Sequence, residues 1–83
     1  MMDEMVLRET VRQCLRSGCL PAAASARTFA CSGNGSACSV CAGAIRGDEL
    51  AFELEFRRPT PPFVAFYQLH PRCYAAWQLE RQL

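Results

Sequence analysis

The sequence predicts a small α+β domain built around a metal-binding site. Two short pairs of candidate ligands, C-S-V-C at 38–41 and H-P-R-C at 70–73, have the spacing of a tetrahedral zinc site. Apolar and polar residues alternate strictly over 50–57, which predicts a strand, and an apolar stripe over 3–17 predicts a helix. The 83 residues form one domain with three expected parts: an N-terminal helix at 1–18, a linker at 19–37 and a zinc finger at 38–83.

The chemistry of the two pairs explains their spacing. A C-x-x-C turn can direct the sulfurs of Cys38 and Cys41 at one point. Pro71 favours the first position of a helix, which makes His70 the cap residue and places Cys73 on the first turn. Residues three apart on a helix share a face, so His70 and Cys73 can reach the same ion. We therefore expect Cys38, Cys41, His70 and Cys73 to bind one structural Zn²⁺.

Four alternatives concern the same residues. The cysteines of the chain could instead form a pair of disulfides, or four of them could be unrelated residues of a small core. A catalytic zinc would need an open coordination position or a nearby base, and His70 is the only histidine of the chain. Cys31, seven residues before Cys38, could replace one ligand, although the two pairs already supply four.

Residues 3–17 are expected to form an amphipathic helix that ends at Gly18, which suits a left-handed cap. Its apolar stripe comprises Leu7, Val11, Cys14 and Leu15. The stripe either docks on the finger or binds a partner or a second copy, and its periodicity fits both interpretations. Cys14 is expected to be an apolar helix position and Cys19 a linker thiol, neither with an assigned partner.

The expected linker runs from Pro21 and an alanine-rich stretch to the turn S-G-N-G-S at 32–36. A phosphate-binding loop is not indicated, because neither G-K-[ST] nor G-x-G-x-x-G follows. After the C-x-x-C knuckle, Gly43 and Gly47 supply flexibility before the first strand of the hairpin.

The expected hairpin consists of strands at 50–57 and 63–69. One face of the first strand carries Leu50, Phe52, Leu54 and Phe56, and the other carries Ala51, Glu53, Glu55 and Arg57. The intervening R-P-T-P-P must be a loop, since proline cannot pair within a sheet. The second strand delivers His70 to the metal, and a helix at 71–82 should pack Trp77 against the hairpin beside the site.

A knuckle C-x-x-C, a β-hairpin and a helix beginning with H-x-x-C resemble a treble-clef zinc finger. The distance between C-S-V-C and H-P-R-C and the aromatic sequence C-Y-A-A-W are similar to poly(ADP-ribose) polymerase-type fingers, and to small uncharacterised bacterial zinc-finger-like proteins. The resemblance covers about residues 29–83 and implies that Cys38, Cys41, His70 and Cys73 are zinc ligands. Polymerase-type fingers recognise DNA breaks with basic residues, and this chain departs from them because it has no lysine.

Charge and composition limit the function. The net charge is +1, and from Cys38 onward five arginines face five acidic residues, which argues against tight electrostatic binding of nucleic acid. No segment has the length of a signal peptide or a membrane span, and six cysteines without a leader predict a reducing cytoplasm and a metal rather than a disulfide framework.

These features favour a cytoplasmic protein that acts as a protein-interaction or regulatory module. We expect an unidentified protein partner, no association with a membrane and no enzymatic activity. The alternative is a nucleic-acid-binding finger in which Arg57, Arg58 and Arg72 cluster with Phe63 or Tyr67. A redox role through Cys14, Cys19 or Cys31 is a third hypothesis.

Overall fold

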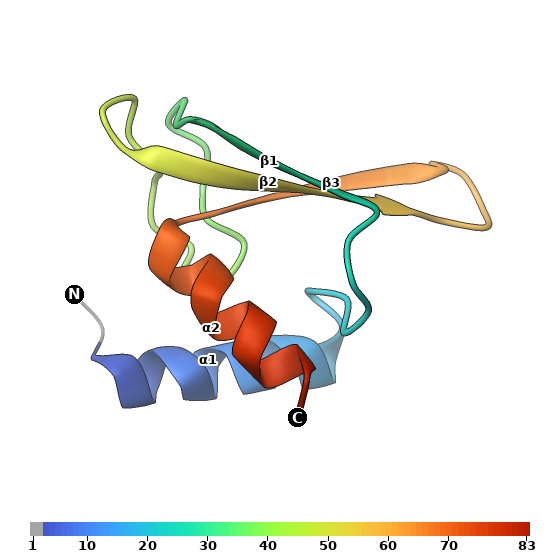
Figure 1. Ribbon diagram of the computed structural model, residues 1–83, viewed down its shortest axis with the longest axis horizontal. Coiled ribbons are helices and arrows are strands. Elements are labelled where there is room, and N and C mark those ends of the chain that lie inside the picture. Colours follow the sequence, from blue (N-terminus) through green and yellow to red (C-terminus); the bar gives the residue numbers. More distant parts are fainter. Residues whose placement is uncertain (1–2) are drawn as a thin grey trace.

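The computed structural model describes residues 3–83 and contains two helices and one three-stranded antiparallel sheet over that range (Figure 1). The elements in chain order are α1 (Glu4–Ser17), β1 (Arg27–Ser32), β2 (Leu50–Arg57), β3 (Val64–Leu69) and α2 (Pro71–Arg81). The strand order in the sheet is β1-β2-β3. The predicted α+β class is confirmed. Within 3–83, neither helix has the length and apolar character needed to cross a membrane.

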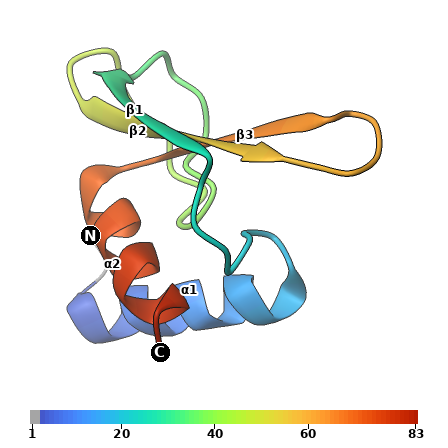
Figure 2. The same cartoon turned by 45° about the vertical axis from the view of Figure 1, so that its right-hand side comes forward.

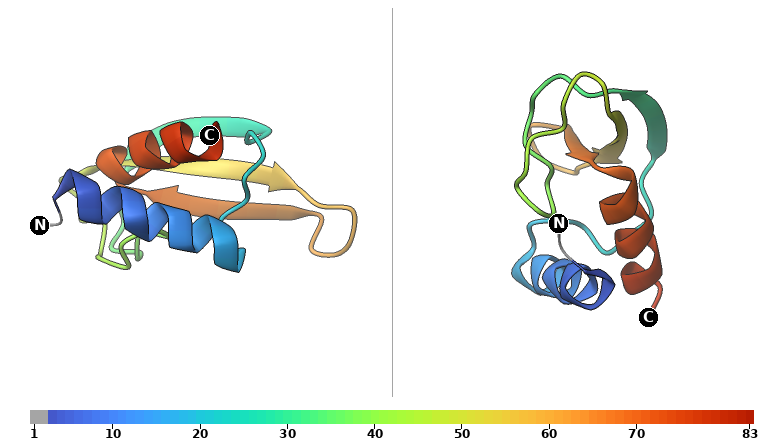
Figure 3. Two further views of the ribbon diagram at one scale, coloured as in Figure 1. Left: turned by 90° about the horizontal axis from the view of Figure 1, so that it is seen from below. Right: turned by 90° about the vertical axis from the view of Figure 1, so that its left-hand side faces the viewer.

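Both helices lie on the same side of the sheet. In Figure 1 the sheet is uppermost, α1 is lowest, and α2 descends from the end of β3 between them. The rotated view keeps this arrangement, with both helices below the strands (Figure 2). Seen from below, α1 and α2 run across one face of the sheet, so its opposite face carries neither helix (Figure 3).

The first helix forms where the sequence predicts it. The Asp3 side chain accepts a hydrogen bond from the Val6 backbone N–H at 2.9 Å and caps the helix. Gly18, with φ of 82°, ends it in the left-handed conformation expected of a glycine cap. Leu7 and Val11 are buried, and α1 packs against α2. The structure therefore supports the interpretation in which the apolar stripe docks on the rest of the chain.

Glu80 of α2 joins the two helices. Its side chain is only 2% exposed and accepts hydrogen bonds from Arg8 Nε at 2.6 Å and Arg12 Nε at 2.8 Å. Burial raises the pKa of Glu80, but the hydrogen bonds from Arg12 and Arg8 outweigh it and bring the pKa below its ordinary value. A buried carboxylate is thus paired with two cations from the other helix.

The hairpin pairs as predicted over most of its length. β2 has the expected bounds, β3 begins at Val64, and the register opposes Phe52 to Leu69 and Arg57 to Val64. The expected alternation fails at the beginning of β2, where Leu50 is 49% exposed and Ala51 is fully buried. These two residues precede the part of β2 that pairs with β3. The hairpin, with one buried and one exposed face, therefore does not include them.

The interpretation of 19–37 as a linker is wrong for residues 27–32. These residues form β1, which pairs with β2 from Arg27 opposite Glu55 to Ser32 opposite Leu50. β1 is an edge strand, and most of its residues are exposed. An edge strand with little burial on either face has no need of apolar alternation, so its sequence did not indicate a strand.

Cys14 and Cys19, to which the sequence assigned no partner, form a disulfide. The cause is the left-handed turn at Gly18, which brings the chain back so that the Cys19 N–H donates to the Cys14 carbonyl at 3.0 Å. The expectation of a chain without disulfides is therefore wrong for this pair.

Trp77 is buried against the hairpin, as predicted. It is fully buried and lies edge-to-face against Phe56 with ring centroids 6.0 Å apart. Its indole N–H donates to the Pro21 carbonyl at 2.9 Å. The segment between α1 and β1 is thereby attached to α2, and Leu20 in the same segment is also buried.

Candidate metal centre

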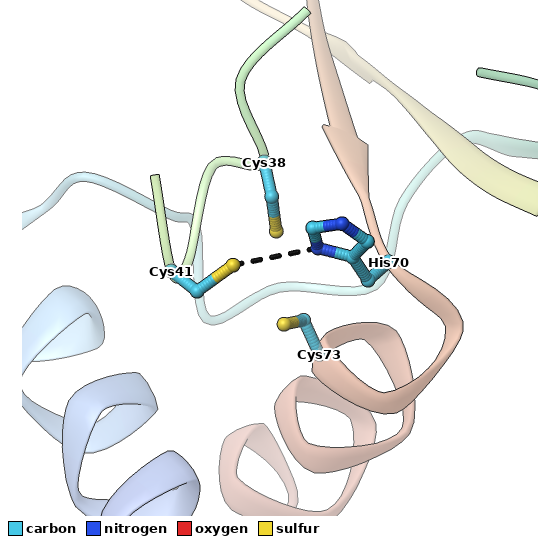
Figure 4. A group of neighbouring side chains, drawn as sticks. All are labelled: Cys38, Cys41, His70 and Cys73. Atoms are coloured by element: carbon cyan, nitrogen blue, oxygen red, sulfur yellow. Dashed lines mark hydrogen bonds between the residues drawn. The ribbon is translucent and has the colours of Figure 1, made fainter. Parts of the chain in front are cut away.

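The structure brings together the four residues predicted as ligands. Their candidate ligand atoms all lie within 4.8 Å of one another. Figure 4 shows the side chains converging from two directions, Cys38 and Cys41 from the knuckle loop, and His70 and Cys73 from the end of β3 and the first turn of α2. A group of three thiols and one imidazole at this separation could hold one metal ion.

The knuckle is a tight turn held at both ends. The Ala42 N–H donates to the Cys38 carbonyl at 2.9 Å, and the Cys38 N–H donates to the Gly43 carbonyl at 2.8 Å. The residue in the left-handed conformation is Ala42, with φ of 64°, rather than the glycine beside it. The Ser39 N–H donates to the Gln68 carbonyl at 2.9 Å, which fixes the knuckle to β3 two residues before His70.

His70 is the N-cap of α2 and Pro71 follows at the start of the helix, as the sequence predicts. The imidazole is oriented by its Nε2, which lies 3.2 Å from the Ala44 carbonyl and can only donate to that oxygen. The other ring nitrogen, Nδ1, then carries the lone pair and faces the Cys41 sulfur at 3.4 Å. A backbone carbonyl that fixes the tautomer in this way is a common outer partner of a metal-binding histidine.

The protons in the group are unevenly held. A hydrogen bond from the Cys73 side chain lowers the pKa of Cys38 to about 4, against the opposing effect of burial. The same hydrogen bond, together with burial, raises the pKa of Cys73 above its ordinary value. The geometry thus stabilises one thiolate beside a protonated thiol. A divalent cation would displace the proton of Cys73, because zinc binds cysteine as the thiolate.

The donor set and its size fit zinc. Three sulfurs and one imidazole nitrogen are a standard structural set, and bonds of about 2.3 Å in a tetrahedron place sulfurs about 3.8 Å apart. The observed limit of 4.8 Å between candidate ligand atoms needs only a small contraction around an ion. The same donors would suit other thiophilic ions, so the arrangement supports one metal ion and favours zinc.

One side of the group opens into a cleft of about 380 Å³. Three of the four candidate ligands line it, Cys41, His70 and Cys73. Cys41 and His70 are half-buried, whereas Cys38 and Cys73 are 3% and 4% exposed. The remaining lining residues are Leu7, Glu49, Pro71 and Arg72.

The other residues that the sequence singled out lie outside the group of four. Cys31, the candidate substitute ligand, is a free, half-buried cysteine of β1 and does not belong to the group of four. The arginines of the nucleic-acid alternative are divided. Arg72 lies beside the metal centre at the start of α2, whereas Arg57 and Arg58 lie at the opposite end of the hairpin (Figure 1).

Comparison of the chain with protein-family models, curated proteins and solved structures gave no significant match. The resemblance to polymerase-type treble clefs therefore stays a prediction, and the structure itself supports the broader description of a small α+β domain with a zinc-finger-like ligand group.

Proposed function

We propose that this chain is a small zinc-binding protein in which the metal is structural and the domain acts as a protein-interaction module rather than an enzyme. The observation that carries the proposal is the convergence of Cys38, Cys41, His70 and Cys73. Four protein ligands occupy all four coordination positions of a tetrahedral zinc ion and leave none for water. The ion would join the knuckle to the end of the hairpin and the beginning of α2.

The uncovered face of the sheet supports an interaction with protein. Paired residues of antiparallel strands point to the same side, and Phe29 is opposite Glu53 while Phe66 is opposite Glu55. Leu54, between the two glutamates, is fully buried toward the helices, so this set points away from them. Phe29 is 40% exposed and Phe66 is 57% exposed, which leaves two aromatic rings on an open face.

The charges on this face indicate the kind of partner. The carboxylates of Glu53 and Glu55 lie on the central strand between the two rings, and the register places Arg27 and Arg57 on the same face at the end of β2 near the hairpin loop. The two carboxylates between the rings repel phosphate, and they attract basic side chains. We therefore propose that the partner is a protein segment with both apolar and basic residues. We also propose that the chain acts in the cytoplasm. The Cys14–Cys19 disulfide does not favour that location, since disulfides are uncommon in reducing compartments.

A photo-crosslinking amino acid at Phe66 tests the interaction, with the same group at Leu83 as a matched exposed position away from the sheet. We expect a discrete protein adduct at 66 and none at 83. Reversal of charge in Glu53→Lys/Glu55→Lys should abolish the adduct while bound zinc remains. An adduct unaffected by the charge reversal, or recovery of nucleic acid alone, would contradict the proposal.

A further inference from the structure

Cys41 differs from the other two thiols of the metal centre in its surroundings. Cys41 and Cys73 both line the cleft, but Cys41 is half-buried, whereas Cys38 and Cys73 are almost completely buried as residues. Small molecules in solution can therefore approach the Cys41 sulfur more easily than the Cys38 sulfur.

Hydrogen bonding to sulfur distinguishes the thiols further. Cys38 Sγ accepts a hydrogen bond from the Val40 backbone N–H at 3.4 Å. Over residues 3–83, the structure shows no comparable backbone donor to Cys41 Sγ, whose neighbour is the His70 ring at 3.4 Å. A sulfur that accepts hydrogen bonds is a weaker nucleophile, because nucleophilicity falls with basicity. Cys41 thus combines the greatest exposure of the three thiols with a sulfur that, unlike that of Cys38, accepts no such backbone hydrogen bond in the described structure.

The backbone beside Cys41 leaves its sulfur uncovered. A Cβ atom added to Gly43 would lie 3.5 Å from Cys41 Sγ and 3.9 Å from His70 Cε1, which are ordinary contact distances. Glycine at this position thus leaves unfilled the space that a methyl group could occupy against the sulfur.

We propose that Cys41 is a modification site at which hydroperoxides oxidise this centre and release its metal. The inference rests on the proposed zinc ion. A second thiolate needed to complete the reaction is at hand, because the Cys38 and Cys73 sulfurs lie within 4.8 Å of the Cys41 sulfur.

The reaction proceeds in two balanced steps. The Cys41 thiolate attacks hydrogen peroxide, an S–O bond forms, the O–O bond breaks, and hydroxide leaves to be protonated to water. The thiolate of Cys38 or Cys73 then attacks the sulfenic sulfur, an S–S bond forms, the S–O bond breaks, and a second hydroxide leaves as water. Two thiolates, one peroxide and two protons give one disulfide and two waters, with two electrons passing from sulfur to peroxide oxygen. A zinc ion bound by the four residues would thereby lose two of its ligands and be released.

The test begins with measurement of zinc in the purified protein, followed by treatment with sub-stoichiometric hydrogen peroxide. Released zinc is recorded with a colorimetric chelator, and the first disulfide is located by mass spectrometry. We expect roughly one zinc ion released per new disulfide, with Cys41 in that disulfide, and modification of Cys41 on the order of tenfold faster than that of Cys31. Cys31 is an internal control, because it is free, half-buried and outside the group.

A matched pair of glycine variants tests the role of exposure. Gly43→Ala places a methyl group against Cys41 Sγ, whereas the nearest atom to a Cβ at Gly47 is the Gly33 carbonyl oxygen at 3.8 Å. Gly43→Ala should slow both oxidation and zinc release several-fold, and Gly47→Ala should leave both rates unchanged.

Three results would overturn the inference: a first disulfide between Cys38 and Cys73, first oxidation at Cys31, or equal rates in the two glycine variants. If the purified protein contains no zinc before peroxide is added, the proposed function fails instead, so the two failures are distinguishable.

Discussion

At the scale of single residues, the buried carboxylate of Glu80 is the clearest electrostatic element of the fold. We expect Glu80→Gln to lower the melting temperature by several degrees, because Arg8 and Arg12 lose the charge to which they donate. Glu9→Gln is the matched control, since the Glu9 side chain is 48% exposed in its pairs with Arg12 and Arg16. Equal melting temperatures for the two variants would contradict this account of Glu80.

Glu80 also predicts a pH dependence. Its pKa in the folded protein lies below the ordinary value of 4.5, so its contribution to stability is fully present above about 4.5. The contribution is lost as the pH falls from that value through the lower folded pKa. Unfolding by urea across pH 3 to 6 should therefore show a steeper acid loss in the unmodified chain than in Glu80→Gln. Parallel curves for the two proteins would contradict the assignment.

Trp77 makes a second prediction at this scale. Trp77→Phe keeps an aromatic ring in the core but leaves the Pro21 carbonyl without its indole donor, which should cost about 1–3 kcal/mol of unfolding free energy. Tyr74→Phe provides the comparison, because the Tyr74 hydroxyl is half-buried and accepts only from Gln78 in the described structure. Urea unfolding measures both, and a smaller loss for Trp77→Phe than for Tyr74→Phe would refute the role of this hydrogen bond.

At the scale of elements, the end of β1 meets the segment after the knuckle at Gly33. A Cβ atom there would lie 2.6 Å from the Ile45 carbonyl oxygen and even closer to that of Arg46, so the backbones would have to separate. Gly33→Ala should cost about 1–3 kcal/mol. Gly47→Ala, which meets only one atom at 3.8 Å, should be close to neutral by the same urea measurement. Similar costs for both would show that the close approach at Gly33 does not exist.

The disulfide at the end of α1 gives a further prediction. Closing the short loop between Cys14 and Cys19 should stabilise the chain by about 2 kcal/mol through the entropy of the unfolded state. Cys19→Ser should lower the unfolding free energy by that amount, and a reductant should do the same to the unmodified chain without affecting Cys19→Ser. An equal response of both proteins to reductant would mean that the bond lies elsewhere.

The elements also show what could be predicted from the sequence. The α1 helix, the β2 strand and the cap at His70 were predictable because burial of one face, alternation and proline placement each produce a local pattern. β1 was not, because an exposed edge strand produces no such pattern. The Cys14–Cys19 bond was missed because a left-handed glycine, rather than helical spacing, brings the two sulfurs together.

The four candidate ligands could be found because metal chemistry fixes their spacing, whereas the exposure of Cys41 depends on how α1 and α2 pack.

At the scale of the whole molecule, the candidate metal centre is where separate parts of the chain meet. The knuckle, the end of β3 and the start of α2 each supply ligands, and Leu7 of α1 lies at the edge of the same cleft. Zinc binding of about 10–16 kcal/mol in small zinc-finger peptides is comparable with the entire stability of an ordinary domain, about 5–15 kcal/mol. We therefore expect the region 38–83 to require the ion for its fold.

The most direct test is to measure the metal content of the freshly purified protein and then follow its circular dichroism as a strong zinc chelator is added. The account predicts one zinc ion per chain, loss of the folded spectrum as the ion is removed, and its recovery when zinc is restored. A protein purified without metal, or one whose spectrum does not change when its zinc has been removed completely, would contradict the claim that a zinc ion bound by Cys38, Cys41, His70 and Cys73 holds this fold together.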